Sequence, residues 1–296
     1  MKNILKRITQ LIIALVFIMG IAYLFLYQNN NEHVPIPTHA EFIQARDSAK
    51  RWIIANQDTA LEDHNPMLWW MVKQSLLIES DTELENVYAA YAKRFQKDFP
   101  DSIWQKLFYP ERYARLNIDE VLQYPDYNQH IIFGLTCDRE LAEFDIIREQ
   151  NTFEFCDSYH PISPACITHQ MMGVYFAQKN NCLPVQTTTD LMTSLQNRVI
   201  IQLEYDPRLV DVYLQRVMML LLSEKKELVK PVWIKRILDA QLKDGGWADF
   251  EGMVSTGKNS ELGFTKKSLG ISIPTSDFHA TAQGLLIFTI LATPPS

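Results

Sequence analysis

Clusters of basic residues are the first feature that this sequence lacks. The 296 residues include 28 Lys and Arg against 35 Asp and Glu, a formal net charge of -7, and no segment gathers positive charge. A surface that follows the phosphates of a nucleic acid needs such a basic cluster. We therefore expect no nucleic acid partner. The hydrophobic fraction of 47% is typical of a globular chain with a substantial core.

Charge is absent altogether from residues 8–31, and residues 11–27 are almost continuously apolar. At about 1.5 Å per residue, this run is long enough to cross a hydrocarbon layer of roughly 30 Å. Three basic residues precede it, so the positive-inside bias predicts a cytoplasmic N-terminus. No small-x-small cleavage site follows, which favours an uncleaved signal-anchor. We predict a single-pass protein that contacts the inner membrane through residues 8–27 and has its body in the periplasm.

Cysteine is sparse, and its spacing lacks the CxxC pattern of many zinc sites. The four cysteines lie in one region: Cys137, Cys156, Cys166 and Cys182. An even number in an exported chain predicts two disulfides. If residues 168–179 form one helix, Cys166 and Cys182 lie about 20 Å apart, too far for a bond.

The favoured pairing therefore joins Cys156 to Cys166, closing a loop that contains prolines. The second bond then joins Cys137 to Cys182. A zinc site built from these cysteines with His160 and His169 remains the alternative.

Convincing runs of alternating β-strands are also lacking, and apolar residues recur at helical spacing instead. The predicted helices span residues 41–56, 66–79, 83–97, 110–123, 127–136, 139–150, 168–179, 188–204, 208–224, 231–241 and 277–291. Residue types that suit helix starts occur at Pro66, Pro110, Pro231, Thr168, Asp206 and Asp277. We divide the chain into an anchor (1–28), a proline-containing linker (29–39) and a helical domain (40–296).

The predicted helices alternate in character. Residues 66–79 and 208–224 are apolar nearly all round, whereas 83–97 and 139–150 have a charged face. A helix that is apolar all round is enclosed by others, and a helix with one apolar face lies outside. The alternation predicts stacked helical hairpins, either extended as a solenoid or closed into a toroid.

A weak repeat places His and Gly near the starts of three predicted helices. It reads His130 to Gly134, His169 to Gly173 and, with one residue inserted, His279 to Gly284. Glycine has no side chain, so we expect close helix approach at these positions.

The C-terminal region resembles a known superfamily. Gln241, Gly245 and Trp247 form a Gln-x-x-x-Gly-x-Trp turn, and Asp277 and His279 open a helix about thirty residues later. This pattern is similar to the last hairpin of the α/α-toroid superfamily, which includes terpenoid cyclases and protein prenyltransferases. The resemblance covers about the last sixty residues. With the helix count, it implies an all-α fold: an N-terminal transmembrane helix followed by an incomplete (α/α) toroid of about five helical hairpins.

The chemistry of those families does not carry over. The Asp-x-Asp-Asp acid of squalene-cyclase-type enzymes is missing, and Gly246 stands where a prenyltransferase would have a zinc-binding cysteine after Asp244. The complement-like thioester and the zinc motifs of lanthionine cyclases are also missing. We assign no metal site and leave the cofactor unknown, so the function depends on the site.

The cavity mouth of a toroid lies where its inner helices begin. There we expect His169 and His279 to meet Asp244 and Asp277, which makes these four the candidate catalytic acid-base groups. Candidate ligand-binding residues are His130, Asp138, Gln170, Trp247 and Gln283. Alternatively, each histidine only fixes its own loop. The long segment 248–276 is expected to cover the mouth, or else to be a plain surface excursion.

Three functions remain open from the sequence. The first is a periplasmic protein that binds an envelope polymer, a lipid or a partner protein in its central cavity. The second is a carbohydrate or isoprenoid enzyme that uses the His/Asp cluster. The third is an interaction scaffold, expected if the cavity is filled and an apolar patch lies outside.

Overall fold

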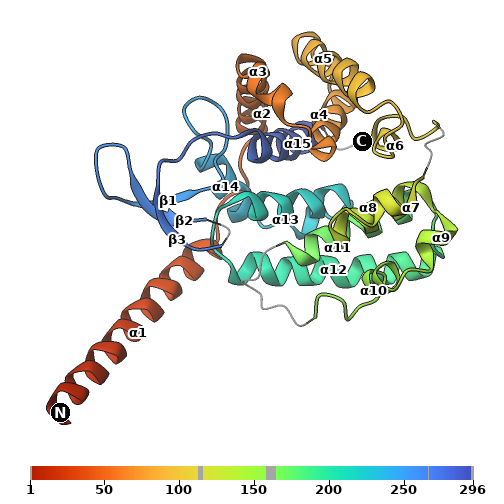
Figure 1. The fold of residues 1–296 in the computed structure, drawn as a ribbon. Helices are drawn as coiled ribbons and strands as arrows, with labels where there is room; N and C mark the ends of the chain where they lie inside the picture. Colours follow the sequence, from red (N-terminus) through yellow and green to blue (C-terminus); the bar gives the residue numbers. More distant parts are fainter. Residues whose placement is uncertain (1, 113–115, 158–164, 266, 295–296) are drawn as a thin grey trace.

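Helices dominate the protein, and one small sheet accompanies them (Figure 1). The computed structural model describes residues 2–112, 116–157, 165–265 and 267–294. The N-terminal half contains α1 (Lys2–Asn30), α2 (His39–Ala55), α3 (Gln57–Glu62), α4 (Pro66–Ile78), α5 (Thr82–Asp98), α6 (Gln105–Phe108), α7 (Ile118–Val121), α8 (Asp126–Thr136), α9 (Arg139–Ala142) and α10 (Asp145–Gln150). The C-terminal half contains α11 (Cys166–Lys179), α12 (Val185–Tyr205), α13 (Asp211–Leu222), a 3-10 turn η1 (Lys226–Leu228), α14 (Pro231–Asp239) and α15 (Phe278–Ala292).

Helix α1 projects from the body as a single long rod (Figure 1). Residues Ile4–Asn30 are long and apolar enough to cross a membrane, and none of the most apolar window is buried in the body. The predicted apolar anchor helix is therefore confirmed as a helix. It runs past residue 28, however, and Asn30 is fully buried in the body. The segment predicted as a linker thus begins with a docked helix end.

Local signals placed several helix starts correctly. Pro66 and Pro231 occupy the first turns of α4 and α14, and the Asp277 carboxylate caps α15 by accepting from the Ala280 N–H at 2.8 Å. Asp206 was expected to start a helix, but it ends α12 instead. Thr168 is likewise inside α11, which begins at Cys166. Both residues have partners in the fold that local capping rules do not consider.

Two predicted helices are wrong. Over 110–123 only the short α7 forms; residues 113–115 lie outside the described part of the chain. The segment 139–150 breaks into α9 and α10. At about 100° per residue, Leu141 and Ile147 would point about 120° apart on one straight helix. The break allows both side chains to be buried.

The segment 248–276 contains strands that the periodicity did not predict. β1 (Glu251–Ser255), β2 (Glu261–Phe264) and β3 (Leu269–Ser272) form an antiparallel sheet in the order β1-β2-β3. Gly252, Gly263 and Gly270 pair across the three strands and so lie on one face. Glycines in place of polar side chains hide the usual alternation of a half-buried strand.

Enclosed helices alternate with outer helices along the chain. α4, α8, α11, α13 and α15 are buried over most of their length, whereas α2, α5, α10, α12 and α14 each keep an exposed face. α15 packs against α2, α4 and α13, and α11 packs against α8 and α12. The core therefore lies around the enclosed helices, as the sequence pattern indicated.

The glycines of the repeat lie at close contacts. A Cβ on Gly134 would meet the Gly173 carbonyl oxygen at 2.7 Å, one on Gly173 would strike the His130 ring, and one on Gly284 would strike the Trp247 ring. The expectation of close approach is confirmed. A side chain at any of the three would force its neighbours apart.

The cysteines pair as the sequence predicted. Cys137 bonds Cys182 with a Cα–Cα distance of 4.7 Å, and Cys156 bonds Cys166 with 6.1 Å. Cysteines bonded in this way cannot serve as thiolate ligands for zinc; His160 of that alternative lies outside the described residues. Two disulfides are typical of a protein in an oxidising compartment.

Candidate functional site

A cavity of about 270 Å³ opens where the enclosed helices begin. α4, α8, α11 and α15 contribute residues of their first turns, and α13 contributes Gln215. Three aromatic residues line it: Trp104, Tyr124 and Tyr127. Five polar side chains line it: Asn65, Asn128, His169, Gln215 and His279. The remaining wall consists of Pro66, Met67, Leu68, Met71, Ile131 and Met172. An apolar cavity with a few polar groups is the usual form of a ligand site.

Helix starts hold these side chains in place. Asn65 caps α4 by accepting from the Met67 N–H at 3.0 Å, and Pro66 fixes the first turn. Asp277 caps α15, so that His279 falls in its first turn. The caps therefore set both where the helices begin and which residues reach the cavity.

His169 and His279 line this one cavity, as the sequence predicted. The His169 ring stacks on Tyr127 with centroids 4.1 Å apart. The His279 Nδ1 lies 3.9 Å from Oδ2 of Asp211, whose side chain is almost completely buried. Sequence reasoning missed Asp211, because it assigned the helix start to Arg208 and the capping role to Asp206. An acidic residue at the true first position of α13 was the available signal.

The two predicted catalytic carboxylates are engaged in turns instead. Asp277 accepts from the N–H groups of Ala280 and Asp249, and burial raises its pKa. Asp244 accepts from the Trp52 indole at 3.1 Å and from the Ser276 hydroxyl at 2.7 Å. Neither residue lines the cavity. Of the four predicted catalytic groups, the fold thus brings only the imidazoles together there.

His130 occupies the interior rather than the mouth. Its ring is fully buried against Gly173, and Nε2 lies 3.0 Å from the Asn151 side-chain oxygen. Burial lowers the pKa of His130 to about 4, so the ring is neutral near pH 7. The first two histidines of the sequence repeat therefore play different roles: one packs at a helix crossing, and the other faces the cavity.

The other predicted ligand-binding residues do not line this cavity. Asp138 caps α9, and Gln170 donates to the carbonyls of Gln150 and Thr152. Trp247 donates to the Ile237 carbonyl and stacks on Phe288, and Gln283 is buried in α15. Through these contacts, the residues connect helices to turns and helices to other helices.

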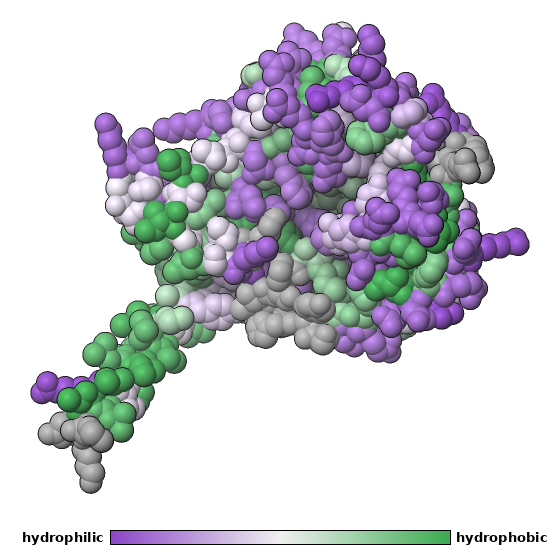
Figure 2. Space-filling model, in the orientation of Figure 1, coloured by the Kyte–Doolittle hydropathy of each residue, from purple (hydrophilic) through white to green (hydrophobic). Residues whose placement is uncertain are grey.

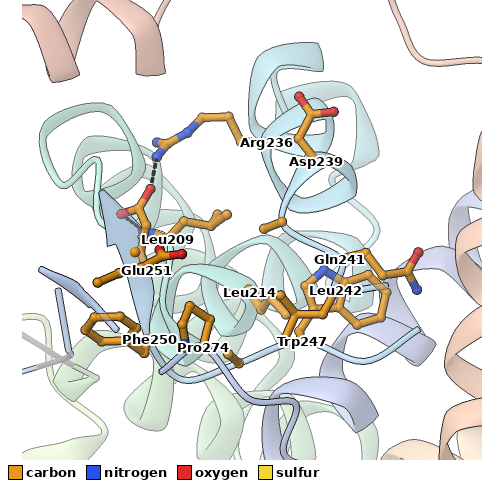
Figure 3. A pocket seen from close by; sticks show the side chains of 14 residues that line it. Leu209, Leu214, Arg236, Asp239, Gln241, Leu242, Trp247, Phe250, Glu251 and Pro274 are labelled. Carbon is orange, nitrogen blue, oxygen red and sulfur yellow. Dashed lines mark hydrogen bonds and ion pairs between the residues drawn. The ribbon is translucent and has the colours of Figure 1, made fainter. Parts of the chain in front are cut away.

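A second cavity of about 450 Å³ lies between α14 and the sheet (Figure 3). Trp247 lines it, together with Ala248, Phe250 and Pro274 from the long segment. Arg236 on its wall pairs with Glu251 at 2.9 Å. The described residues of the segment 248–276 contribute nothing to the lining of the first cavity, which the segment is expected to cover, and border this second one instead.

Within the described ranges, no group of three or more His, Cys, Asp and Glu side chains is placed to hold a metal ion. No protein-family model, curated protein or solved structure matches the chain. The cavity at the helix starts is therefore the candidate functional site.

Proposed function

We propose that the protein belongs to the cell envelope, held in the inner membrane by α1 with its N-terminus in the cytoplasm and its body in the periplasm. The length and apolar surface of α1, the basic residues ahead of it and the two disulfides support this placement. Alkaline phosphatase fused after the C-terminus should be active, and green fluorescent protein at the same place should be dark. The reverse pattern would place the body in the cytosol.

The same proposal assigns the body to an incomplete (α/α) toroid of five hairpins. Outer helices α2, α5, α10, α12 and α14 would each precede an enclosed helix: α4, α8, α11, α13 and α15. The position of the cavity supports this assignment, because all five enclosed helices line it near their N-terminal ends. The Gln241 side chain adds a second argument, since it bonds the carbonyls of Ala45 and Gly245 across the turn that resembles the toroid superfamily.

The proposed activity is binding of one sugar unit of an envelope polymer in the 270 Å³ cavity. The observation that supports this is the lining of the cavity, which combines aromatic rings with amide and imidazole side chains. A sugar can lay its apolar ring face on Tyr127 or Trp104 while its hydroxyl groups bond polar side chains such as Asn128 and Gln215. The size lies at the lower end for ligand sites, which suits a single unit rather than a long segment.

Native mass spectrometry of the full chain, released from the membrane in detergent, tests this proposal. A hexose-containing species should copurify, and oligosaccharides from digested envelope should bind the emptied protein. Tyr127→Ala should abolish binding, whereas Phe99→Ala, an exposed aromatic outside the cavity, should leave it intact. A copurified lipid or peptide lost in Tyr127→Ala would place a different ligand class in the cavity, and retention of a sugar by Tyr127→Ala would exclude the cavity as its site.

An enzyme remains the second candidate, supported by the 3.9 Å approach of His279 to Asp211 beside the cavity. A buried carboxylate can orient an imidazole that acts as a general base. Asp211→Asn would then abolish turnover of the bound sugar polymer while leaving its affinity nearly unchanged. Products that form equally fast with Asp211→Asn would exclude this role.

A further inference from the structure

The end of α1 is fixed to the body instead of being joined to it flexibly. Asn30 donates to the Leu203 carbonyl at 2.5 Å and accepts from the Tyr213 hydroxyl at 2.9 Å, while the Trp233 indole donates to the Asn30 carbonyl at 3.2 Å. The Tyr23 hydroxyl donates to the Tyr205 carbonyl at 2.9 Å. These contacts set how the body is oriented on any bilayer that α1 crosses.

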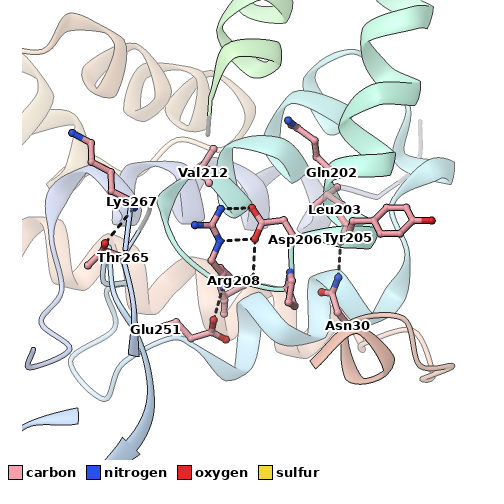
Figure 4. A network of polar contacts seen from close by, with 12 residues as sticks. Asn30, Gln202, Leu203, Tyr205, Asp206, Arg208, Val212, Glu251, Thr265 and Lys267 are labelled. Atoms are coloured by element: carbon pink, nitrogen blue, oxygen red, sulfur yellow. Dashed lines mark hydrogen bonds and ion pairs between the residues drawn. The ribbon is translucent and has the colours of Figure 1, made fainter. Parts of the chain in front are cut away.

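The sheet is connected to the same junction. The Arg236 guanidinium bonds the Asn30 side-chain oxygen and pairs with Glu251, the first residue of β1. Glu251 also accepts from the Leu209 N–H at 2.8 Å. Figure 1 shows the sheet beside the point where α1 leaves the body, and Figure 4 shows Glu251 and Asn30 in one polar network. The orientation of α1 therefore also determines where the sheet lies.

One face of this sheet is apolar and points to solvent. Val254, Leu262 and Ile271 form one cross-strand row. Phe264 and Leu269 form the next row on the same face, and the third member of that row, Glu251, pairs with Arg236 of the body. Ile271 is 66% exposed, Leu269 58% and Val254 57%. The opposite face packs inward: a Cβ on Gly263 would strike the Glu251 carbonyl oxygen and meet the Phe250 ring. Figure 2 shows hydrophobic residues gathered over the sheet, close to the apolar surface of α1.

The charge around this face is positive. Between residues 252 and 276 the sequence has three lysines and one acidic residue, Glu261. Lys258 and Lys267 are exposed in the turns of the sheet, whereas Glu261 borders the second cavity on the inner side. Exposed apolar side chains flanked by lysines are the combination that binds the surface of a membrane with anionic lipids.

We propose that the outer face of the sheet lies on the bilayer that α1 crosses, as a second membrane contact. Val254, Leu269 and Ile271 enter the boundary between headgroups and acyl chains, and Lys258 and Lys267 meet anionic headgroups. The inference rests on the proposed anchoring by α1. Together with the Asn30 junction, this contact holds the body at one fixed tilt on the membrane.

Environment-sensitive labels on single cysteines test the contact. All four native cysteines are bonded, so Ile271→Cys supplies one free thiol in the full chain. The labelled protein is reconstituted in vesicles of phosphatidylethanolamine and phosphatidylglycerol that carry lipid nitroxides near the headgroup. Blue-shifted emission and strong quenching are expected at position 271. The matched control is Val185→Cys, 67% exposed at the opposite end of α12 from Tyr205, where a solvent-like spectrum without quenching is expected.

A label at Val16→Cys in α1, measured in vesicles whose lipid nitroxides lie deep in the acyl chains, separates the two proposals. Quenching at 16 without quenching at 271 overturns the sheet contact and leaves the anchoring intact. No quenching at 16 overturns the anchoring and this inference with it. A blue shift at 271 that appears equally in detergent and increases with protein concentration assigns the face to a second copy of the chain, which also overturns the proposal.

The lysines give an independent readout. Lys258→Glu combined with Lys267→Glu should reduce quenching at position 271 in vesicles that contain phosphatidylglycerol, and much less in vesicles of phosphatidylcholine. Lys93→Glu combined with Lys97→Glu, on the exposed side of α5, is the matched control and should change neither. Equal effects of the two lysine pairs would overturn the headgroup contact.

Discussion

The junction at the end of α1 and the wall of the cavity both contain polar side chains, but in opposite surroundings. At the junction, Asp206 is fully buried and accepts two bonds from the Arg208 guanidinium and one from that of Arg216 (Figure 4). On the cavity wall, side chains such as Asn128 and Gln215 border an open space of about 270 Å³. One region uses polar groups to connect parts of the fold; the other presents them to a space that a ligand can occupy.

The difference shows how to separate stabilising residues from functional ones in this protein. A buried polar group whose partners are other protein groups is costly to remove, because those partners lose their bonds away from water. Removing a polar group that faces a solvent-filled cavity changes the free energy of unfolding of the ligand-free protein only slightly, because water takes its place. Substitutions at the two regions should therefore divide into effects on the free energy of unfolding and effects on binding.

The largest effect is expected from Arg216→Met at the junction. Arg216 is fully buried and lies 3.0 Å from Asp206, so its loss leaves a buried carboxylate with one cationic partner fewer. The free energy of unfolding should fall by about 3 kcal/mol. Denaturant titration of the full chain in detergent measures it. Arg148→Met, which breaks ion pairs on the exposed surface, is the control and should cause no measurable change. Equal effects of the two substitutions would remove the distinction between the regions.

His130 is an interior polar residue that belongs to neither region, and its effect on stability depends on pH. Its pKa is about 4 in the folded protein, against about 6.5 in the unfolded chain. The unfolded state therefore binds more protons between these values, and stability falls as the pH drops from 6.5 to 4, by about 3 kcal/mol from this group. Unfolding curves at several pH values measure the slope. His130→Gln should flatten it; an unchanged slope would contradict the assigned burial.

The same substitution in both regions gives a direct comparison. Asn30→Ala takes a donor from the Leu203 carbonyl and an acceptor from the Tyr213 hydroxyl. The free energy of unfolding should fall by about 1–3 kcal/mol. Asn128→Ala on the cavity wall should lower the free energy of unfolding by less than about 0.5 kcal/mol but weaken sugar binding. Thermal unfolding and binding are measured on both variants. A larger loss of stability in Asn128→Ala would reverse the proposed roles.

The smallest effect on stability is expected from Gln215→Leu. The Thr168 hydroxyl bonds the Gln215 side chain at 2.9 Å but also the Ala165 carbonyl at 3.0 Å, so it keeps a partner. Stability should change by less than about 0.5 kcal/mol, whereas sugar affinity should fall. A calorimetric binding curve and a melting curve on the same sample give both values. Unchanged affinity would place Gln215 outside the binding surface.

Much of the fold could be predicted where the signals were local. The apolar run of α1, the prolines that open α4 and α14, and the cap at Asp277 each act within a few residues of where they stand. The strands were missed because three glycines on one face removed the alternation. The helix expected over 139–150 failed because burial of Leu141 and Ile147 in the core outweighed helical continuity.

The candidate site was predicted in part. His169 and His279 share one cavity because each follows the start of an enclosed helix, a feature visible in the sequence. Asp244 and Asp277 do not reach it, because their oxygens accept bonds from turns, and capping uses the same carboxylates that catalysis would need. Asp211 was missed because the start of α13 was placed too early along the chain.

The sequence by itself determined that a long apolar helix precedes the body, that four cysteines can form two disulfides, and where most helices begin. These outcomes depend on hydrophobic periodicity, capping and chain spacing, which operate over short distances along the chain. Only the tertiary structure decided that Asn30 docks on Leu203, which histidine faces a cavity, and that the sheet is tied to the end of α1. Such contacts join residues far apart in sequence, and packing and burial across the whole core select them.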